Sequence, residues 1–463
     1  MPGNLDDVRD AILENCRNVS VVVYTVEEPT KGYDERVLGR VRERFGIVIS
    51  KGLRVTFVHL HEVKHLLDKP KRLTLLAESW GTIKLAWYAL NVVTPHVYID
   101  TTGCAFTFLV AKILAGCKVA TYVHYPTIST DMLSLVWERR PSYNNDVEIS
   151  ANRLVTYGKL VYYAAFAMMY GMVGSLSDLT MVNSTWTKGH ISRLWRMAGR
   201  IHVVFPPVDT KGLGGSTTTT ATAADDDDEG GGREKMILSI GQFRPEKDHG
   251  LQLRSFAKFL SLRDGAMKRT GAKLVLIGSC RNDDDRERVT ELETLADELG
   301  VRDDVTFVLN EPYPVLRGHL RRASVGVHTM WNEHFGIGVV EMMAAGLVVV
   351  AHDSGGPKSD IILRPWDFEK EEEDSSLPSD SAKSANSTDC TGCLASTADG
   401  YAAAFYQVFS MDEEGESEVI EQIRENGRKS AERFSDEVFM DSFKETILPL
   451  FKNRPRLKLR WQK

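Results

Sequence analysis

The sequence WNEHFGIGVVEMMAAG, residues 331–346, gives the strongest indication of the fold and of a site. Glu333 and Glu341 are separated by seven residues, and Gly336 and Gly338 lie between them. Apolar residues recur with helical spacing after Gly336, so we expect a loop that leads into a helix. Glycines at a helix N-terminus let backbone N–H groups approach a phosphate, and a nearby carboxylate can bind a sugar diol. The pattern suits a nucleotide-sugar site, although a solvated acidic loop before a core helix is the common alternative for such a motif alone.

Apolar runs on both sides of this stretch alternate with helical patterns along the whole chain. Strands are predicted at residues 19–26, 55–60, 97–100, 119–125, 180–183, 203–205, 236–240, 273–277, 305–309, 325–328 and 348–351. In the second half, helices are predicted near residues 251–262, 286–299, 315–322 and 336–345. Near-continuous apolar strands that alternate with helices indicate parallel sheets covered on both faces. The fold class is therefore α/β, with two Rossmann-like domains.

The domain boundaries follow from composition. We expect an N-terminal domain at 1–208, a low-complexity linker at 209–235, a C-terminal domain at 236–440, and a C-terminal helix with a basic tail at 441–463. Within the second domain, the acidic and serine-rich residues 368–398 predict a disordered surface insertion. The tail carries six basic residues from Lys452 onwards, together with Trp461, which fits either an anionic lipid surface or a solvated terminus.

Bulk properties exclude some classes of function. The chain has 463 residues, enough for two domains, and its net charge of −7 argues against nucleic-acid binding over the whole surface. Six scattered cysteines favour a reducing compartment. Cys390 and Cys393 form a C-x-x-C pair, but no second pair lies nearby, so zinc or redox use is not favoured.

Targeting signals are weak. The polar, acidic first ten residues do not resemble a secretory signal. Residues 160–177 are uncharged and reach the short limit for a membrane span. Their Tyr, Gly and Met content, and Asp178 directly after them, favour a buried or membrane-surface helix.

The second domain begins with a strand followed by GQFRPEK, residues 241–247. Gly241 allows a tight turn, and Arg244 and Lys247 are spaced to point the same way at a helix start. Two fixed cations at that place can hold a diphosphate and stabilise it as it leaves. A surface pair of basic residues is an equally ordinary explanation of this motif alone.

The first domain offers His124 at the carboxyl end of the strand predicted at 119–125, where ligands bind in open α/β sheets. His124 could hydrogen-bond a sugar hydroxyl, or be a structural histidine. Asp131 could cap a helix or face an acceptor, and the turn that begins at Asp100 is a weaker candidate for the same cleft.

Three motifs of the second domain are expected to converge. G-x-x-R-x-x-K, E-x7-E and the glycine pair Gly355–Gly356, which could form a further anion-binding nest, all follow strands of one predicted parallel sheet. Carboxyl ends of parallel strands meet at one edge of the sheet. The three motifs together are therefore a much more specific indication of a binding site than any one of them alone.

This combination resembles the GT-B glycosyltransferases of the E-x7-E type, which are retaining enzymes that use nucleotide sugars. It is most similar to the GDP-mannose-dependent α-1,2-mannosyltransferases of asparagine-linked glycosylation. The resemblance rests on HYPTISTDML at 124–133, MVNSTWT at 181–187, GQFRPEK at 241–247 and HTMWNEHFGIGVVE at 328–341. It implies two domains facing a central cleft, and addition of the fourth and fifth mannoses to a dolichol-diphosphate-linked oligosaccharide at the cytosolic face of the endoplasmic reticulum membrane.

The resemblance also implies roles for residues. Arg244 and Lys247 would grip the GDP diphosphate beside Gly241, and Glu341 would bind the ribose. Glu333 would contact the mannose. The resemblance also implies that Phe335, Gly336 and Ile337 lie close to the donor through their backbone. His124 would approach the donor sugar from the acceptor domain. No metal is expected, because the two cations neutralise the diphosphate, and other mannosyltransferases of the pathway are potential partners.

Members of this family begin with a membrane-anchoring helix, then a first strand and a glycine-rich loop. This sequence begins at what resembles the next strand, so we expect an unpaired sheet position in the first domain and an incomplete cleft. Two rival functions follow from the sequence: a soluble GT-B transferase with another acceptor, or a non-catalytic nucleotide-sugar-binding partner in a membrane assembly.

Overall fold

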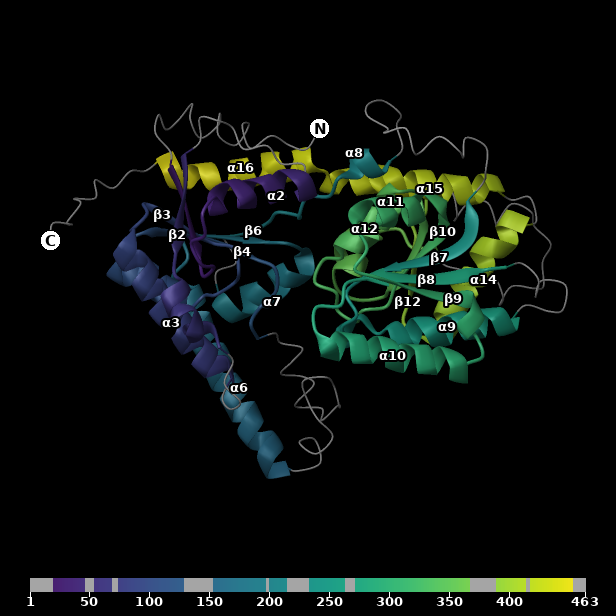
Figure 1. The fold of residues 1–463 in the computed structure, drawn as a ribbon, viewed down its shortest axis with the longest axis horizontal. Coiled ribbons are helices and arrows are strands. Elements are labelled where there is room, and N and C mark those ends of the chain that lie inside the picture. Colours follow the sequence, from purple (N-terminus) through teal and green to yellow (C-terminus); the bar gives the residue numbers. More distant parts are fainter. Residues whose placement is uncertain are drawn as a thin grey trace. The chain divides into compact units, whose positions relative to one another are not determined.

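The computed structural model describes residues 20–45, 54–68, 74–128, 153–196, 200–214, 233–262, 271–366, 389–413 and 417–452. The chain divides into two compact units, Met1–Phe205 with Asp436–Lys463, and Pro206–Ser435 (Figure 1). The chain therefore enters the second unit near the expected boundary and returns to the first unit at Asp436. Each unit is described by itself below.

The second unit is a doubly wound α/β domain. Its strands are β7 (Glu234–Ile240), β8 (Lys273–Gly278), β9 (Val305–Leu309), β10 (Ala323–His328), β11 (Val348–His352) and β12 (Cys393–Ala395). They form one sheet in the order β12-β11-β10-β7-β8-β9, and every neighbouring pair is parallel. The order reverses between β7 and β10, which makes this pair the topological switch point, where ligands bind in such sheets.

Helices cover both faces of this sheet. They are α8 (Thr210–Leu213), η4 (Pro245–Lys247), α9 (His249–Leu262), α10 (Asp283–Glu298), η6 (Arg302–Asp304), α11 (Tyr313–Arg322), α12 (Ile337–Ala344), η7 (Pro357–Ile361), α14 (Ala398–Glu413), α15 (Ser417–Ala431) and η9 (Glu432–Phe434). In Figure 1, α9 and α10 lie on one face, and α11, α12 and α15 lie on the other. Helix α14 packs against α9.

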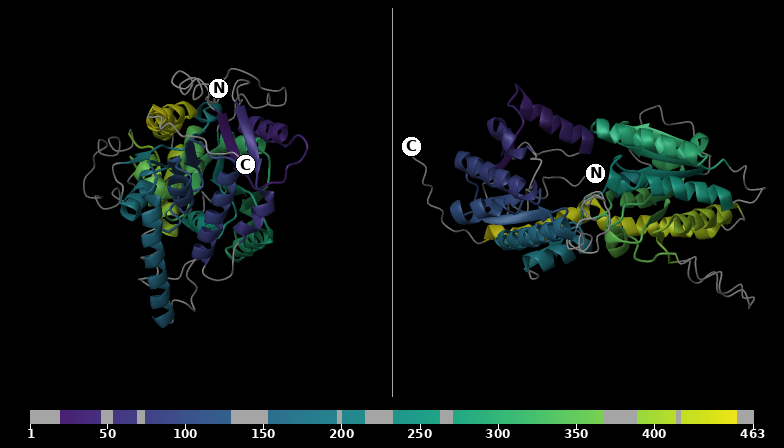
Figure 2. Two further views of the ribbon diagram at one scale, coloured as in Figure 1. Left: turned by 90° about the vertical axis from the view of Figure 1, so that its left-hand side faces the viewer. Right: turned by 90° about the horizontal axis from the view of Figure 1, so that it is seen from below.

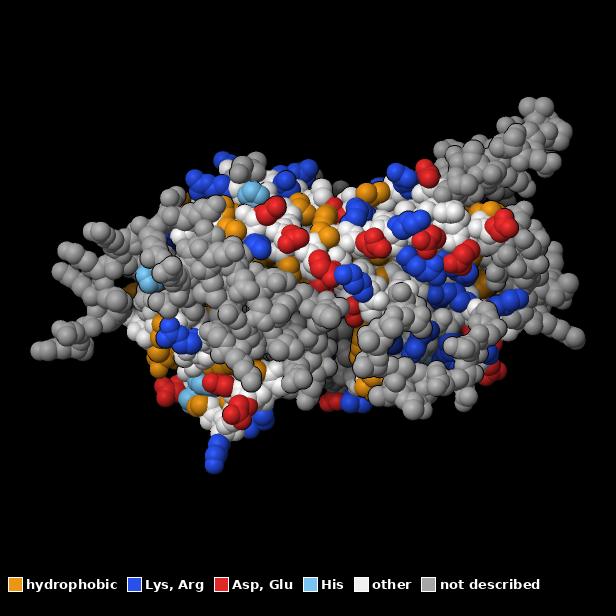
Figure 3. All heavy atoms as spheres, turned by 90° about the horizontal axis from the view of Figure 1, so that it is seen from above, with side chains coloured by type: hydrophobic (Ala, Val, Ile, Leu, Met, Phe, Trp, Pro, Cys, Tyr) orange, Lys and Arg blue, Asp and Glu red, His pale blue; other side chains and the backbone are white. Residues whose placement is uncertain are grey.

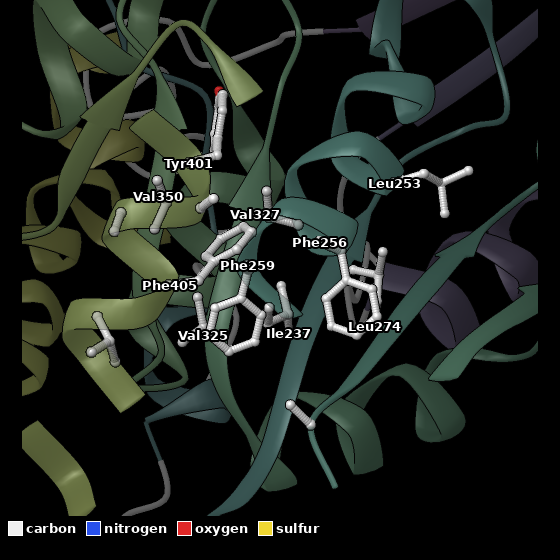
Figure 4. Close-up of a cluster of buried hydrophobic side chains, with 14 of the residues drawn as sticks. Ile237, Leu253, Phe256, Phe259, Leu274, Val325, Val327, Val350, Tyr401 and Phe405 are labelled. Atoms are coloured by element: carbon white, nitrogen blue, oxygen red, sulfur yellow. The ribbon is translucent and has the colours of Figure 1, made fainter. Parts of the chain in front are cut away.

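The core of the second unit lies between the sheet and α9, α10 and α14. Phe256 and Phe259 of α9 meet Phe405 of α14 above the strand residues Ile237 and Val325, and all five are completely buried (Figure 4). Burying one such phenyl ring contributes about 2–3 kcal/mol relative to leaving it in water. This packing fixes β7 and β10, whose ends carry the site.

The first unit contains two small parallel sheets. Strands β1 (Ser20–Thr25) and β2 (Arg54–His59) pair with each other. Strands β3 (Val97–Asp100), β4 (Lys118–Val123), β5 (Leu179–Val182) and β6 (Ile201–Val203) form a four-stranded sheet in sequence order. The helices of this unit are α2 (Tyr33–Phe45), η1 (His61–Leu67), α3 (Thr74–Val92), η2 (Leu109–Leu114), α6 (Arg153–Gly174), α7 (Thr185–Trp195) and α16 (Asp436–Lys452).

The four-stranded sheet is covered on both faces. On one face, Phe108, Phe166 of α6 and Trp195 of α7 form a buried aromatic core. On the other face, Ile447 of α16 packs against strand residues that include Tyr122. Helix α6 extends well past the sheet of its own unit, as the left view of Figure 2 shows.

Most predicted elements are confirmed, with specific corrections. Strand β6 is Ile201–Val203 and not 203–205. The linker prediction for 209–235 is wrong at its ends, because Thr210–Leu213 form α8 and β7 begins at Glu234. The insertion prediction for 368–398 is wrong from residue 389, since β12 adds to the sheet edge beside β11. The remaining 215–232 and 367–388 lie outside the described residues.

Two further expectations concern surface segments. Residues 160–174 of the uncharged segment belong to α6, and among the described residues no helix combines the length and apolar character needed to cross a membrane. The acidic run at 283–285 is not wholly solvated, because Asp285 is buried and ion-paired with Arg281 at 2.9 Å. Asp285 therefore ties the start of α10 to the loop before it.

Candidate active site

The site begins with the loop after β7. The N–H of Gly241 donates to the carbonyl of Ile277 at 3.0 Å, which continues the pairing with β8 past the end of the strand. A Cβ atom at Gly278 would lie 1.7 Å from the carbonyl oxygen of Gly241, so only glycine permits this close approach. The loop then forms the short turn η4, which ends at Lys247.

The two cations of this loop have different partners. Arg244 Nε pairs with Glu246 Oε1 at 2.7 Å, and the Arg244 side chain is 42% exposed. Lys247 Nζ donates to Glu333 Oε2 at 2.5 Å, and its side chain is 23% exposed. The structure therefore brings Lys247 and Glu333 together across 86 residues of sequence, while Arg244 pairs with the nearby Glu246.

The loop after β10 is held by the loop after β11. Asn332, in the left-handed region with φ 52°, donates its N–H to Ser354 Oγ at 2.8 Å. The N–H of Gly356 donates to the carbonyl of Glu333 at 2.7 Å. A Cβ at Gly355, where φ is 62°, would lie 2.3 Å from that same carbonyl oxygen.

These contacts change the interpretation of the glycine pair. It was expected to form an anion-binding nest, but the N–H of Gly356 is already used by Glu333. The two glycines instead let one loop pack closely against another and so fix the backbone of Glu333.

Helix α12 begins beside the end of β7. Gly336 is its N-cap residue, with φ 108°, a backbone conformation that residues other than glycine rarely adopt. A Cβ at Gly338 would lie 3.4 Å from the carbonyl oxygen of Ile240, the last residue of β7. The first turn of α12 therefore meets the strand end that leads to Gly241, which confirms the predicted convergence of these two motifs.

Phe335 and Ile337 flank Gly336 in different environments. Phe335 is buried, and its ring packs edge-to-face against Phe434 with centroids 5.2 Å apart. Ile337 is exposed. Phe335 thus anchors the loop through its side chain, and its backbone lies directly before the start of α12.

The two glutamates have opposite electrostatics. Burial acts to raise the pKa of Glu333, but His328 and Lys247 outweigh it and hold that pKa well below its ordinary range. Burial raises the pKa of Glu341 to about 7. At neutral pH Glu333 is fully ionised, whereas Glu341 is near its titration midpoint, and a pair of carboxyls set apart in this way is typical of functional sites.

Two neighbours of these glutamates carried no assigned role in the sequence analysis. His328, the last residue of β10, lies with Nε2 3.1 Å from Glu333 Oε2. Tyr313, at the start of α11, has its pKa raised to about 12, by burial first and then by the charges of Glu341 and Asp209. The sequence feature that could have identified His328 as a site residue is its position at a strand's carboxyl end, five residues before Glu333.

His124 belongs to the first unit, directly after β4. Its ring lies edge-on to Tyr122 with centroids 4.9 Å apart. Desolvation lowers the pKa of His124, although Asp100 and a hydrogen bond with the backbone of Thr101 act to raise it. His124 is therefore predominantly neutral at pH 7 and able to accept a hydrogen bond.

Asp100 is occupied within its own turn. It accepts hydrogen bonds from the N–H groups of Thr102 and Gly103 and from the hydroxyl of Thr121. Its role is to shape the strand end beside His124. Asp131, the other candidate of this domain, lies outside the described residues.

The described cysteines and acidic groups are not arranged as a cation site. Cys390 and Cys393 are buried at the edge of the sheet, and burial raises the pKa of both thiols. Within the ranges that the structure covers, no group of three or more His, Cys, Asp or Glu side chains is placed to hold a metal ion.

Comparison with solved structures agrees with this architecture. A glycosyltransferase from Rickettsia africae gives a TM-score of 0.58 at 13% identity and covers 96% of this chain and 95% of its own. Sucrose-phosphate synthase from Thermosynechococcus elongatus gives 0.59 at 16% identity, with 94% and 99% covered. At these identities the likeness shows the fold alone, which is GT-B.

Comparison of sequences is more specific. The model described as ALG11 mannosyltransferase N-terminus matches residues 7–195, and the one described as Glycosyl transferases group 1 matches residues 224–363. The chain is 43% identical over 442 residues to the GDP-Man:Man(3)GlcNAc(2)-PP-Dol alpha-1,2-mannosyltransferase of Xenopus laevis, covering 96% of this chain and 83% of that protein. The protein of that name in Homo sapiens is 41% identical over 433 residues, covering 93% and 80%. The chain therefore belongs to this family of mannosyltransferases, which are glycosyltransferases with the GT-B fold.

Proposed function

We propose that this protein transfers mannose from GDP-mannose, in α-1,2 linkage and with retention, to a dolichol-diphosphate-linked oligosaccharide. The acceptor would carry three mannoses, as in the names of its relatives, and would gain the fourth and fifth. The observation that carries the proposal is the meeting of Lys247, Glu333 and the start of α12 at the switch point of the second unit.

The donor-binding roles follow from charge and geometry. Lys247 and Arg244 supply positive charge for the diphosphate, and the first turn of α12 supplies N–H groups and a favourable dipole. Glu341 accepts hydrogen bonds from the ribose diol, and Glu333 from mannose hydroxyls. As the bond to mannose breaks, negative charge grows on GDP, so these fixed groups stabilise the transition state more than the ground state. We propose that they do this without a metal ion.

The acceptor side is proposed for the first unit, at the cytosolic face of the endoplasmic reticulum membrane. Large apolar side chains are exposed on three elements of this unit: Trp80, Trp87, Tyr88 and Val92 of α3, Leu109, Ile113 and Leu114 of η2, and Tyr157, Val161, Met168 and Met172 of α6. Trp and Tyr among aliphatic side chains suit the boundary between headgroups and acyl chains. This composition supports a membrane surface as the place where a lipid-linked acceptor is met.

A transfer assay with the full chain tests the proposal. GDP-mannose and a dolichol-linked acceptor with three mannoses should give a product with five, and Lys247→Ala should abolish transfer while the far-UV circular dichroism stays unchanged. GDP binding without product would support the non-catalytic rival and contradict the proposal. Product from a water-soluble acceptor, with none from the lipid-linked one, would support the soluble transferase.

Vesicle flotation tests the membrane surface separately. Replacing Trp87 and Ile113 by serine should lower the partition constant on vesicles about a hundredfold or more, because each exposed apolar side chain buried in lipid contributes about 1.5–3 kcal/mol. Their GDP affinity should stay at the wild-type value. Unchanged flotation of the double variant would remove this surface from the proposal.

A further inference from the structure

The site contains an ion pair where a donor is proposed to bind. Glu333 Oε2 receives Lys247 Nζ at 2.5 Å and lies 3.1 Å from His328 Nε2. Glu333 Oε1 accepts the N–H of His334 at 3.0 Å. Both oxygens of this carboxylate therefore have partners, and a single oxygen is shared by an ammonium and an imidazole.

This arrangement opposes the binding of a diphosphate. The ammonium of Lys247 is already neutralised, and the Glu333 carboxylate is a fixed negative charge beside the proposed phosphate position. The Glu333 side chain is only 12% exposed, so solvent screens its charge weakly. A nucleotide diphosphate must therefore compete with Glu333 for Lys247.

His328 is placed to hold Glu333 after such an exchange. Its side chain is 5% exposed, and its carbonyl oxygen accepts the hydroxyl of Tyr401 at 2.9 Å. His328 Nδ1 is buried and has no hydrogen-bond partner among the described residues. Its polar contact with Glu333 is therefore made through Nε2, from a rigid position at the end of a central strand.

We propose that Glu333 is an internal competitor that pairs with Lys247 and releases it to the donor diphosphate, with His328 as the positioning residue that then keeps Glu333 in place for the sugar. This rests on the proposed nucleotide-sugar function. It adds that one carboxylate weakens binding of the nucleotide and yet serves transfer of the sugar.

The first test measures GDP alone, by isothermal titration calorimetry on the full chain. Glu333→Gln keeps the shape and removes the charge, so GDP should bind about tenfold more tightly while mannose transfer is lost. Lys247→Met should weaken GDP about tenfold or more. Glu293→Gln is the matched control, since Glu293 forms an exposed ion pair with Arg302 at 3.0 Å, and it should leave GDP affinity unchanged.

The outcomes are distinguishable from failure of the proposed function. Wild-type protein that does not bind GDP would contradict the nucleotide-sugar function itself. Wild-type protein that binds GDP, together with a Glu333→Gln variant that binds it equally or more weakly, would overturn the competitor role alone.

The second test separates positioning by His328 from a structural role. His328→Gln can keep an N–H donor near Glu333, whereas His328→Met fills a similar volume without one. We expect kcat of the Met variant to fall about tenfold, and that of the Gln variant to stay within about threefold of wild type. KM for the donor should rise in the Met variant, because Lys247 becomes the main partner of Glu333. Equal losses of kcat in both variants, or a Met variant with wild-type kcat, would overturn the role of His328.

Discussion

At the scale of single residues, Glu341 is the group most sensitive to pH. Its pKa of about 7 in the folded protein stands above the ordinary 4.5, and desolvation is the cause. The folded state therefore binds more protons than the unfolded state between these values, so stability falls as pH rises from 4.5 to 7. Above pH 7 the Glu341 carboxylate is ionised in the folded protein, and the loss of stability no longer changes with pH. A ribose diol would offset that cost by donating hydrogen bonds to the carboxylate.

The variant Glu341→Gln tests this directly. It should raise the free energy of unfolding by about 3 kcal/mol at pH 8 and change it little near pH 4.5, while GDP binds more weakly. Urea unfolding of the second unit at the two pH values, with Glu293→Gln as control, measures the difference. An equal effect at both pH values would mean that ionisation of Glu341 does not destabilise the folded protein.

At the scale of elements, close approaches of backbone assemble the site. Gly278 of β8 touches the carbonyl of Gly241, and Gly338 of α12 touches that of Ile240. These contacts set the position of the loop that carries Lys247. Larger side chains would push that loop away from the strand end, and so away from Glu333.

Gly278→Ala should therefore be strongly destabilising, by about 3 kcal/mol or more, because its Cβ would lie 1.7 Å from the Gly241 carbonyl oxygen. Gly318→Ala in α11 is the matched control, since its Cβ meets no described atom within 4 Å. The control substitution should raise the free energy of unfolding by about 0.5–1 kcal/mol. Thermal unfolding of both variants measures this, and similar shifts would contradict the close-approach argument.

Most strands and their parallel arrangement were predictable from the sequence, whereas side-chain partners were not. Buried strands such as β8 and β11 are near-continuous apolar runs. The rule that carboxyl ends of parallel strands meet at one edge correctly placed the first turn of α12, at Gly338, beside Ile240 at the end of β7. Strand β12 was missed because Cys393–Ala395 is three residues long and follows a serine-rich segment. Its place depends on pairing with β11, a long-range contact that local composition does not reveal.

For the site, too, the motifs were predictable from the sequence but the contacts between their side chains were not. E-x7-E and the basic motif could be located by type and spacing, but the Lys247–Glu333 pair joins residues 86 positions apart. The third contact of Glu333, from His328, depends on the direction of a side chain at a strand end. Phe335 shows why backbone and side chain must be separated, since its ring is core while its backbone lies at the helix start.

At the scale of the whole molecule, the chain leaves the first unit and returns to it. Helix α16 completes the core of the first unit after the second unit has been formed. Acidic and basic side chains are interspersed on the face shown in Figure 3. Helix α15 is an example, with Arg428 paired to Glu421 at 2.9 Å and Glu425 at 3.4 Å. Such pairs contribute little to stability and keep a surface soluble.

The return of the chain makes stability of the first unit depend on its last helix. Ile447→Ala should lower the free energy of unfolding of this unit by about 2–5 kcal/mol, since the side chain is 1% exposed. The exposed Val438→Ala in the same helix should cost less than about 1 kcal/mol. Differential scanning calorimetry measures both variants. A first-unit transition unchanged by Ile447→Ala would show that α16 is not part of that core.

The central claim is that one nucleotide diphosphate is bound by Lys247 and the start of α12, with its ribose at Glu341. A crystal structure of the chain with GDP tests it most directly. The account predicts diphosphate oxygens within about 3 Å of Lys247 Nζ and of N–H groups in the first turn of α12. It also predicts that Lys247 has left Glu333. GDP bound elsewhere, or bound with the Lys247–Glu333 pair intact and no contact to α12, would contradict it.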